Sequence, residues 1–106
     1  MSIKFSVIIP CYNASKFINS LINSIVKSDI LPDEIIFVND CSTDNTLNIL
    51  QNLNLEKIKK IVVSTAVNSG PGEARNLGVK NSSNENLIFL DSDTNITPSL
   101  FKTYLS

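Results

Sequence analysis

Two carboxylates one residue apart, Asp91 and Asp93, are the side chains of this sequence that most directly suggest a chemical role. They come directly after the apolar run 87–90, which predicts a strand buried on both faces of a parallel sheet. The backbone turns just past the end of such a strand, and the two side chains can then converge on one point. Two carboxylates held together repel each other, and the pKa of one of them would rise.

Two interpretations of these aspartates are open from this stretch alone. A hard divalent cation such as Mg2+ or Mn2+ removes the repulsion and favours carboxylate and phosphate oxygens, so the first interpretation is a metal–diphosphate site. The second is an acidic loop that leads into a helix, with Thr97 at the N-cap and Pro98 at the first helical position. The rest of the sequence decides between them.

The composition limits the classes of protein that need to be considered. A chain of 106 residues, of which 42% are hydrophobic, forms one domain over residues 1–106 or part of one. Its net charge of −1, with eight lysines and one arginine, shows no basic patch and indicates no nucleic-acid partner. The sequence contains no histidine, which excludes His-based catalytic triads and His metal sites within these residues.

Cysteine content and hydropathy indicate the compartment. Cys11 and Cys41 are too few for a disulfide framework and are expected to be reduced, space-filling residues. The sequence shows neither a signal peptide nor an apolar run of membrane-spanning length, so a cytoplasmic setting is expected. The chain ends shortly after a predicted helix start and without a stop signal, which predicts a truncated domain.

The apolar runs of the sequence predict four strands separated by helices. Strands are expected over residues 5–9, 34–38, 61–63 and 87–90. Pro10 is expected to end the first of them. The alternation predicts an α/β fold, a Rossmann-like parallel sheet with flanking helices and right-handed crossovers. In such sheets ligands bind at the carboxyl ends of the strands, where the strand order reverses.

Two predicted helices carry features that the structure can test. The first has an apolar stripe that includes Phe17 and Val26, with Asn13 or Ser15 as its cap. A later helix contains Gly78, which is expected to weaken it by about 1 kcal/mol relative to alanine.

The unusual polar clusters of the sequence all fall at the carboxyl ends of predicted strands. They lie at 11–13, 39–40 and 91–93. Asp40 could accept hydrogen bonds from an imide N–H or a ribose hydroxyl, Tyr12 could stack on a flat ring, and Arg75 could pair with phosphate or a nucleobase. Helix capping, partial burial and pairing with a neighbouring glutamate are the structural alternatives for these three side chains. Their shared position favours a binding site.

Four motifs in order resemble those of family-2 glycosyltransferases. They are SVIIPCYN at 6–13, VNDCSTD at 38–44, NSG at 68–70 followed by ARNLG at 74–78, and FLDSD at 89–93. The resemblance covers nearly the whole chain and implies the first half of a GT-A domain, the fold of nucleotide-diphospho-sugar transferases. It implies inverting transfer from a nucleotide-sugar, most often a UDP-sugar, to a glycan or other hydroxyl acceptor. The implied setting is polysaccharide assembly on the cytoplasmic face of the membrane.

The resemblance also implies roles for individual residues. The residues implied to bind the nucleotide are Pro10, Cys11, Tyr12, Asp40, Arg75, Asp91 and Ser92. Asp40 would contact the base, while Asp91 and Asp93 match the D-x-D motif, in which the first aspartate usually meets the ribose. The motif's ion, Mn2+ or Mg2+, bridges the diphosphate and acts as a Lewis acid on the departing UDP.

The sequence departs from the family pattern in two places. Cys41 stands where family members often carry glycine, which is unfavourable if that position needs a positive φ. The carboxylate base that takes the acceptor's proton lies in the second half of the family's domain, and nothing after Asp93 can replace it. No catalytic residue is therefore assigned, and these residues alone are expected to be inactive.

Two other functions compete with this interpretation. A phosphatase of the haloacid-dehalogenase type shares an apolar strand followed by D-x-D-x-T, but Asn95 stands where its threonine belongs. A catalytically inert nucleotide- or metal-binding half-domain that associates with itself is the second alternative. A GT-A sheet that ends after its fourth strand would expose an edge and part of its core, so a dimer or higher oligomer is expected.

Overall fold

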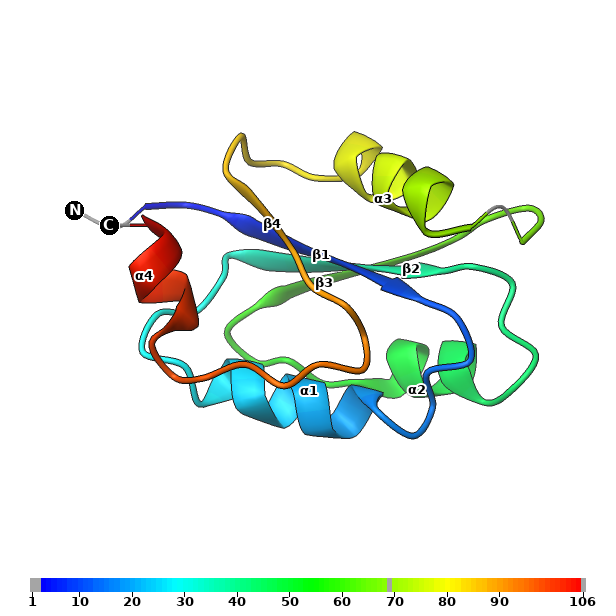
Figure 1. The fold of residues 1–106 in the computed structure, drawn as a ribbon, viewed down its shortest axis with the longest axis horizontal. Helices are drawn as coiled ribbons and strands as arrows, with labels where there is room; N and C mark the ends of the chain where they lie inside the picture. Colours follow the sequence, from blue (N-terminus) through cyan, green and yellow to red (C-terminus); the bar gives the residue numbers. More distant parts are fainter. Residues whose placement is uncertain (1–2, 69, 106) are drawn as a thin grey trace.

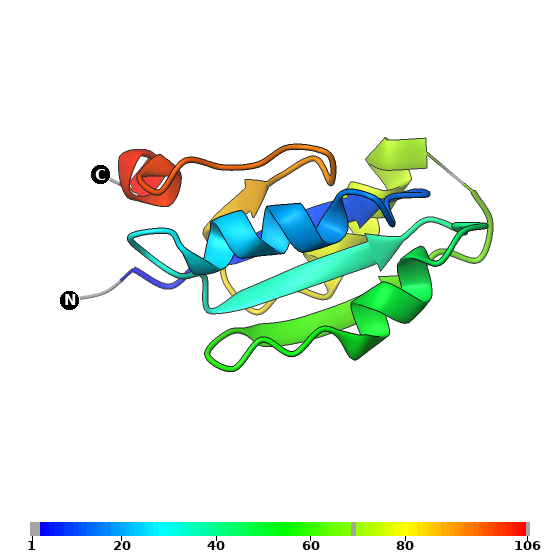
Figure 2. The same ribbon diagram turned by 90° about the horizontal axis from the view of Figure 1, so that it is seen from below.

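A four-stranded parallel sheet with helices on both faces is formed by residues 3–68 and 70–105, which the computed structural model describes (Figure 1). The elements are β1 (Ser6–Cys11), α1 (Ile18–Val26), β2 (Glu34–Asn39), α2 (Thr46–Asn52), β3 (Lys59–Ser64), α3 (Gly70–Lys80), β4 (Leu87–Phe89) and α4 (Leu100–Leu105). The strand order is β3-β2-β1-β4. Helices α1 and α2 cover one face and α3 the other (Figures 1 and 2). The predicted Rossmann-like α/β fold is confirmed.

Pro10 lies inside β1 and does not end it, so that expectation is wrong. Leu90 N donates to Ile8 O, which shows that every second residue of β1 directs its backbone groups toward β4. Pro10 is the next residue of this set, and β4 has already ended opposite it. The missing N–H of proline therefore leaves no gap in the ladder, and β1 continues to pair with β2 as far as Cys11.

Hydrophobic residues form one cluster on each face of the sheet. The cluster under α1 and α2 includes Val7, Ile9, Ile35, Phe37 and the aromatic pair Phe5 and Phe101, whose ring centroids lie 5.1 Å apart. The smaller cluster under α3 consists of Ile8, Ile36, Val38 and Ala74. The two central strands are therefore buried on both faces, which agrees with their continuous apolar sequences.

The final strand, β4, is less buried than its sequence predicts. Ile88 is buried, but Phe89 is 44% exposed. Among the described residues β4 pairs with β1 alone, so it forms an edge of the sheet. The expectation that the run 87–90 is buried on both faces is wrong, because an apolar run is buried only where neighbouring elements cover it.

Gly78 marks a close approach of α3 to the sheet. A Cβ atom at this position would lie 2.5 Å from Ile8 Cγ2 and 3.3 Å from Val38 Cγ2. The helix runs unbroken through it. Glycine costs the helix about 1 kcal/mol relative to alanine. The close packing of α3 on the sheet nevertheless requires a residue without a Cβ at this position, and the sequence did not reveal this requirement.

Helix α1 packs its apolar stripe on the sheet, but both ends of the stripe are exposed. Phe17 is 44% exposed and Val26 is 45% exposed. Phe17 occupies the N-cap position, and no side chain caps the helix there. The prediction that Asn13 or Ser15 caps α1 is therefore wrong. Within residues 3–68 and 70–105 no helix has the length and apolar character needed to cross a membrane.

A buried carboxylate, Glu34, joins the strands at their amino ends. It is 2% exposed and accepts hydrogen bonds from the Ser6 hydroxyl at 2.7 Å and the Ser83 N–H at 2.6 Å. Asn84 Nδ2 donates to Ser6 Oγ at 3.0 Å, which ties in the connection between α3 and β4. Burial favours the neutral acid, but these hydrogen bonds and the charge of Lys59 outweigh it and lower the pKa of Glu34 below its usual 4.5.

Acidification is expected to weaken the fold through Glu34. Because its folded-state pKa lies below the unfolded value of 4.5, the ionised side chain contributes stability above that pH, and the contribution is lost as the pH falls through the lowered pKa. Glu34→Gln should cost about 2 kcal/mol near pH 7 and much less at an acid pH below the lowered pKa. Urea denaturation at both pH values measures this, with the exposed Glu56→Gln as control. An equal loss at both would contradict the prediction.

Candidate nucleotide and metal site

A pocket of about 510 Å³ opens at the carboxyl edge of the sheet. The strand order reverses there between β1 and β4, which is where ligands bind in open α/β sheets. Its lining includes every residue that the sequence singles out for a nucleotide or a metal: Pro10, Cys11, Tyr12, Asp40, Arg75, Asp91, Ser92 and Asp93. The fold thus brings four separate segments to one pocket, while the roles of these residues in binding remain predictions.

The loops that follow β1 and β2 hold each other in place through hydrogen bonds between residues 13–15 and 42–46, here called the cross-brace. Asn13 adopts a φ of +49°, and its side-chain oxygen accepts the backbone N–H groups of Thr43 at 2.8 Å and Asp44 at 3.3 Å. The Asn13 N–H donates in return to Ser42 Oγ at 3.0 Å. Asn13 therefore stabilises the neighbouring loop and not its own helix.

Side chains of the second loop complete the cross-brace. The Ala14 N–H donates to Thr46 Oγ1 at 2.8 Å, and the Ser15 N–H donates to Asp44 Oδ2 at 3.3 Å. Asp44 also accepts the N–H and the hydroxyl of Thr46. The Thr46 hydroxyl is the main cause that lowers the pKa of Asp44 to about 2. These bonds give partners to the backbone N–H groups of the segment before α1. They also hold the backbone next to Tyr12, which lines the pocket.

Cys41 adopts a left-handed backbone conformation, with a φ of +56°. The position therefore has the backbone geometry that favours glycine, the residue that family members often carry there. Its thiol donates weakly to Thr65 O at 3.4 Å. Both cysteines are free, and burial raises the pKa of Cys11 to about 12, which agrees with a space-filling role.

Cys41→Gly is expected to stabilise the chain by about 1 kcal/mol, because glycine adopts the left-handed conformation without the Cβ penalty. Cys41→Ala is the matched control, since it removes the thiol and keeps the Cβ. It should give no gain. Urea denaturation midpoints of both variants measure the difference. If the glycine variant were no more stable than the alanine variant, the backbone strain would be negligible.

Asp40 is a buried carboxylate at the end of β2, 4% exposed. Its Oδ1 accepts the Thr65 hydroxyl at 2.7 Å, and its Oδ2 accepts the N–H of Gly70, the first residue of α3, at 3.1 Å. These bonds join β2 to the segment that leads from β3 into α3. Asp40 is therefore an anchor of the pocket wall as well as the candidate acceptor for a base. No local sequence pattern predicts this second role.

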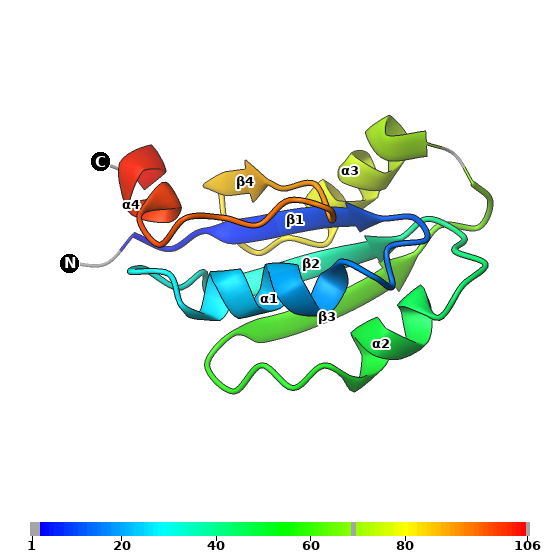
Figure 3. The same ribbon diagram turned by 60° about the horizontal axis from the view of Figure 1, so that its bottom comes forward.

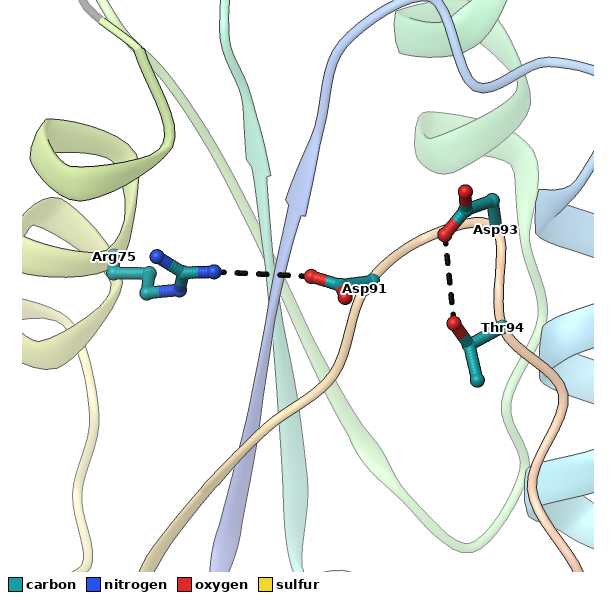
Figure 4. A network of polar contacts seen from close by, with 4 residues as sticks. All are labelled: Arg75, Asp91, Asp93 and Thr94. Atoms are coloured by element: carbon teal, nitrogen blue, oxygen red, sulfur yellow. Dashed lines mark hydrogen bonds and ion pairs between the residues drawn. The ribbon is translucent and has the colours of Figure 1, made fainter.

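The two aspartates after β4 have different partners (Figure 4). Asp91 Oδ1 lies 3.7 Å from Arg75 Nη2, and Asp93 accepts the hydroxyl of Thr94 at 3.4 Å. Each carboxylate thus has a partner of its own, and both line the same pocket. The side chains of Arg75 and Asp91 are 42% and 71% exposed, and an ion pair this open to solvent contributes little to stability. A ligand can therefore replace it at small cost.

The donor set suits a divalent metal that is shared with a phosphate ligand. Mg2+ commonly takes one or two carboxylates and completes its shell with substrate phosphates and water. Asp91 and Asp93 supply two exposed carboxylates on one loop. Across the described ranges there is no group of three or more His, Cys, Asp or Glu side chains that could hold a metal without such a ligand. The residues fit a metal–diphosphate site better than a metal site of protein groups alone.

The remaining lining residues were not assigned a binding role from the sequence, although Asn13 belongs to the polar cluster at 11–13. They are Asn13, Ala14, Phe17, Asn68, Gly70, Pro71 and Ala74. Asn68 and Gly70 belong to the NSG motif, whose central Ser69 lies outside the described residues, so a signal for them existed. Phe17 had none, because its place in the apolar stripe of α1 predicted burial.

Comparisons with known proteins identify the family of this chain. The sequence matches the family model described as glycosyl transferase family 2 over residues 6–105. It is 39% identical over 101 residues to poly(ribitol-phosphate) beta-N-acetylglucosaminyltransferase TarS of Staphylococcus aureus, a match that covers 93% of this chain and 18% of TarS. It is 38% identical over 93 residues to a poly(ribitol-phosphate) beta-glucosyltransferase of Bacillus spizizenii, covering 85% of this chain and 15% of the relative.

Solved structures of similar proteins share the fold. A crystal structure of TarS residues 1–349 in complex with UDP-GlcNAc gives a TM-score of 0.85 at 40% identity, covering 97% of this chain and 30% of that one. A mannosyltransferase from Pyrobaculum calidifontis in complex with GDP-Man and Mn2+ gives 0.87 over 96% of this chain and 31% of that one, but at 20% identity it supports the fold alone. The chain spans less than a fifth of the length of these two relatives. It belongs to glycosyltransferase family 2 and carries part of the family's GT-A domain.

Proposed function

We propose that this chain binds the nucleotide-sugar donor of a glycosyltransferase, with a UDP-sugar as the donor. The observation that carries the proposal is the pocket at the carboxyl ends of β1 and β4, because it gathers the candidate base, ribose and metal residues from four segments. The similarity to TarS, which was crystallised with UDP and with UDP-GlcNAc, supports a uridine nucleotide.

Each wall of the pocket has a part in this proposal. Asp40 accepts hydrogen bonds from the base, Tyr12 stacks on it, and Pro10, Cys11 and Ser92 line the nucleoside's path. Arg75 exchanges its exposed partner for the nucleotide. A bound Mn2+ or Mg2+, held by Asp91 and Asp93, would supply Lewis-acid stabilisation of the diphosphate leaving group.

Calorimetric titration of UDP with and without Mn2+ tests the proposal. We expect binding that strengthens when Mn2+ is present, and weaker binding of GDP as the comparison nucleotide. UDP affinity that is the same with and without Mn2+ would show that nucleotide binding does not require a metal held by the aspartates. No binding of either nucleotide in either condition would contradict the proposal.

The whole protein, we propose, is an inverting transferase that uses a glycan or other hydroxyl acceptor at the cytoplasmic face of the membrane. These residues alone should transfer little sugar, since no Asp or Glu follows Asp93 to serve as base. Turnover of UDP-GlcNAc with an added polyol-phosphate acceptor at ordinary enzyme rates by the 106 residues would overturn this part.

Self-association is a second candidate property, favoured by the edge position of β4 and the exposure of Phe89. Edge strands and exposed apolar side chains recruit partners. Light scattering on the 106 residues should give the mass of a dimer or higher oligomer. A monodisperse monomer would exclude an inert half-domain that assembles with itself.

A further inference from the structure

Phe17 is an aromatic side chain at the pocket that neither the core nor the proposed nucleotide contacts use. It is 44% exposed at the start of α1 and lines the pocket. Val26, near the other end of α1, is equally exposed at 45% but lies outside this pocket. Both residues are therefore similarly exposed at the ends of the helix, but of the two Phe17 alone lines the pocket.

Helix α1 runs alongside the segment between β4 and α4, which contains Asp93 (Figure 3). Residues 17, 20 and 24 are three and four apart, so they share one face of the helix. The bonds that join this face to the loop are those of Ser20 with Asn95, at 2.9 Å, and of the Ile96 N–H with Ser24 Oγ, at 3.1 Å. The loop thus runs parallel to α1, and Asp93, which precedes Asn95 in the chain, lies toward the end of the face that Phe17 occupies.

The pocket consequently has two chemically different sides. On the α3 side, Asp40 bonds the first residue of α3 and Arg75 reaches Asp91. On the α1 side lie Phe17 and Asp93. A nucleotide-sugar is linear, in the order base, ribose, diphosphate and sugar. With the base at Asp40 and the diphosphate at the aspartates, the sugar ring falls beside Phe17.

We propose that Phe17 forms the apolar wall on which the sugar ring of the donor packs, an inference that rests on the proposed donor function. A hexose in its ring form exposes C–H groups on one face, and these pack well against an aromatic ring. Ligand pockets combine such aromatic walls with a few polar groups, which here are the two aspartates. Phe17 is thus a specificity residue for the sugar and not for the nucleotide.

Paired titrations of UDP and UDP-GlcNAc in the presence of Mn2+ test the proposal. Phe17→Ala should weaken UDP-GlcNAc binding about tenfold and change UDP binding by less than about twofold. Phe17→Tyr, which keeps the ring, should restore the affinity for UDP-GlcNAc. Val26→Ala on the same helix is the matched control and should change neither ligand. Thermal denaturation of each variant confirms that the chain is folded.

The outcomes separate this inference from the proposed function. If the unaltered protein binds UDP and Phe17→Ala weakens both ligands equally, Phe17 serves the nucleotide and the inference is wrong. Unchanged binding of both ligands to Phe17→Ala would also overturn it, while leaving the donor site intact. If the unaltered protein fails to bind UDP at all, the donor function itself is wrong and this inference falls with it.

Discussion

Replacing Asp93 with asparagine is expected to abolish the metal-dependent part of UDP binding. The asparagine side chain keeps the shape of the carboxylate and removes the charge that attracts a divalent cation. In the structure the carboxylate is exposed and accepts one hydroxyl at 3.4 Å, so the substitution should leave the fold unchanged. Metal coordination to a diphosphate is worth several kcal/mol, and we expect UDP affinity in Mn2+ to fall by about 100-fold.

The control for this prediction is Asp29→Asn, which removes an exposed carboxylate outside the pocket. It should leave UDP affinity and its metal dependence as they are. Titrating UDP into both variants at matched Mn2+ concentrations gives the comparison. An Asp93→Asn variant that still responds to Mn2+ like the unaltered protein would show that the metal, if bound, is held elsewhere.

Gly78→Ala is expected to lower the free energy of unfolding by about 2 kcal/mol, although alanine is the better helix former. The new methyl group would lie 2.5 Å from Ile8 Cγ2, in the fully buried centre of β1. Neither partner can move without shifting α3 or the sheet. Because α3 carries Arg75 and its first N–H bonds Asp40, the shift should also weaken the pocket wall. Urea denaturation measures the loss.

Gly72→Ala in the same helix is the matched control, because a Cβ there meets nothing within 4 Å. It should be neutral or stabilising by up to about 1 kcal/mol. The double variant with Ile8→Ala removes the clashing methyl group. It should be less destabilised than the sum of its two single variants. Strict additivity would mean that the close approach of α3 does not set the cost.

The order of strands and helices was predictable because apolar runs and their spacing are local properties. The confirmed parts are the alternation, the parallel sheet and the gathering of polar clusters at one edge. Pro10 was misjudged because the effect of a proline depends on whether a neighbouring strand still needs its N–H. Phe89 was misjudged because burial depends on which elements cover a strand. Both properties depend on the tertiary arrangement of the strands and helices.

The membership of the pocket was predictable from the motifs, but the hydrogen bonds within it were not. Asp40 and Asn13 form hydrogen bonds with residues about 30 positions away in the chain. No local sequence pattern predicts such partners. Gly78 was read from helix propensity alone, whereas its reason is a contact across the sheet. Cys41 is different, since the glycine usual at that position raised the question of a positive φ, which the structure has.

The cross-brace has a consequence for the entropy of ligand binding. Fixing a loop residue costs about 1–2 kcal/mol in conformational entropy. Residues 13–15 and 42–46 are already held by mutual hydrogen bonds, so their ordering belongs to folding and not to the association with a ligand. A nucleotide that docks on these loops does not have to offset the entropy cost of ordering them, so it binds with higher affinity. Loosening Asn13 would add the ordering cost of these loops to the free energy of binding.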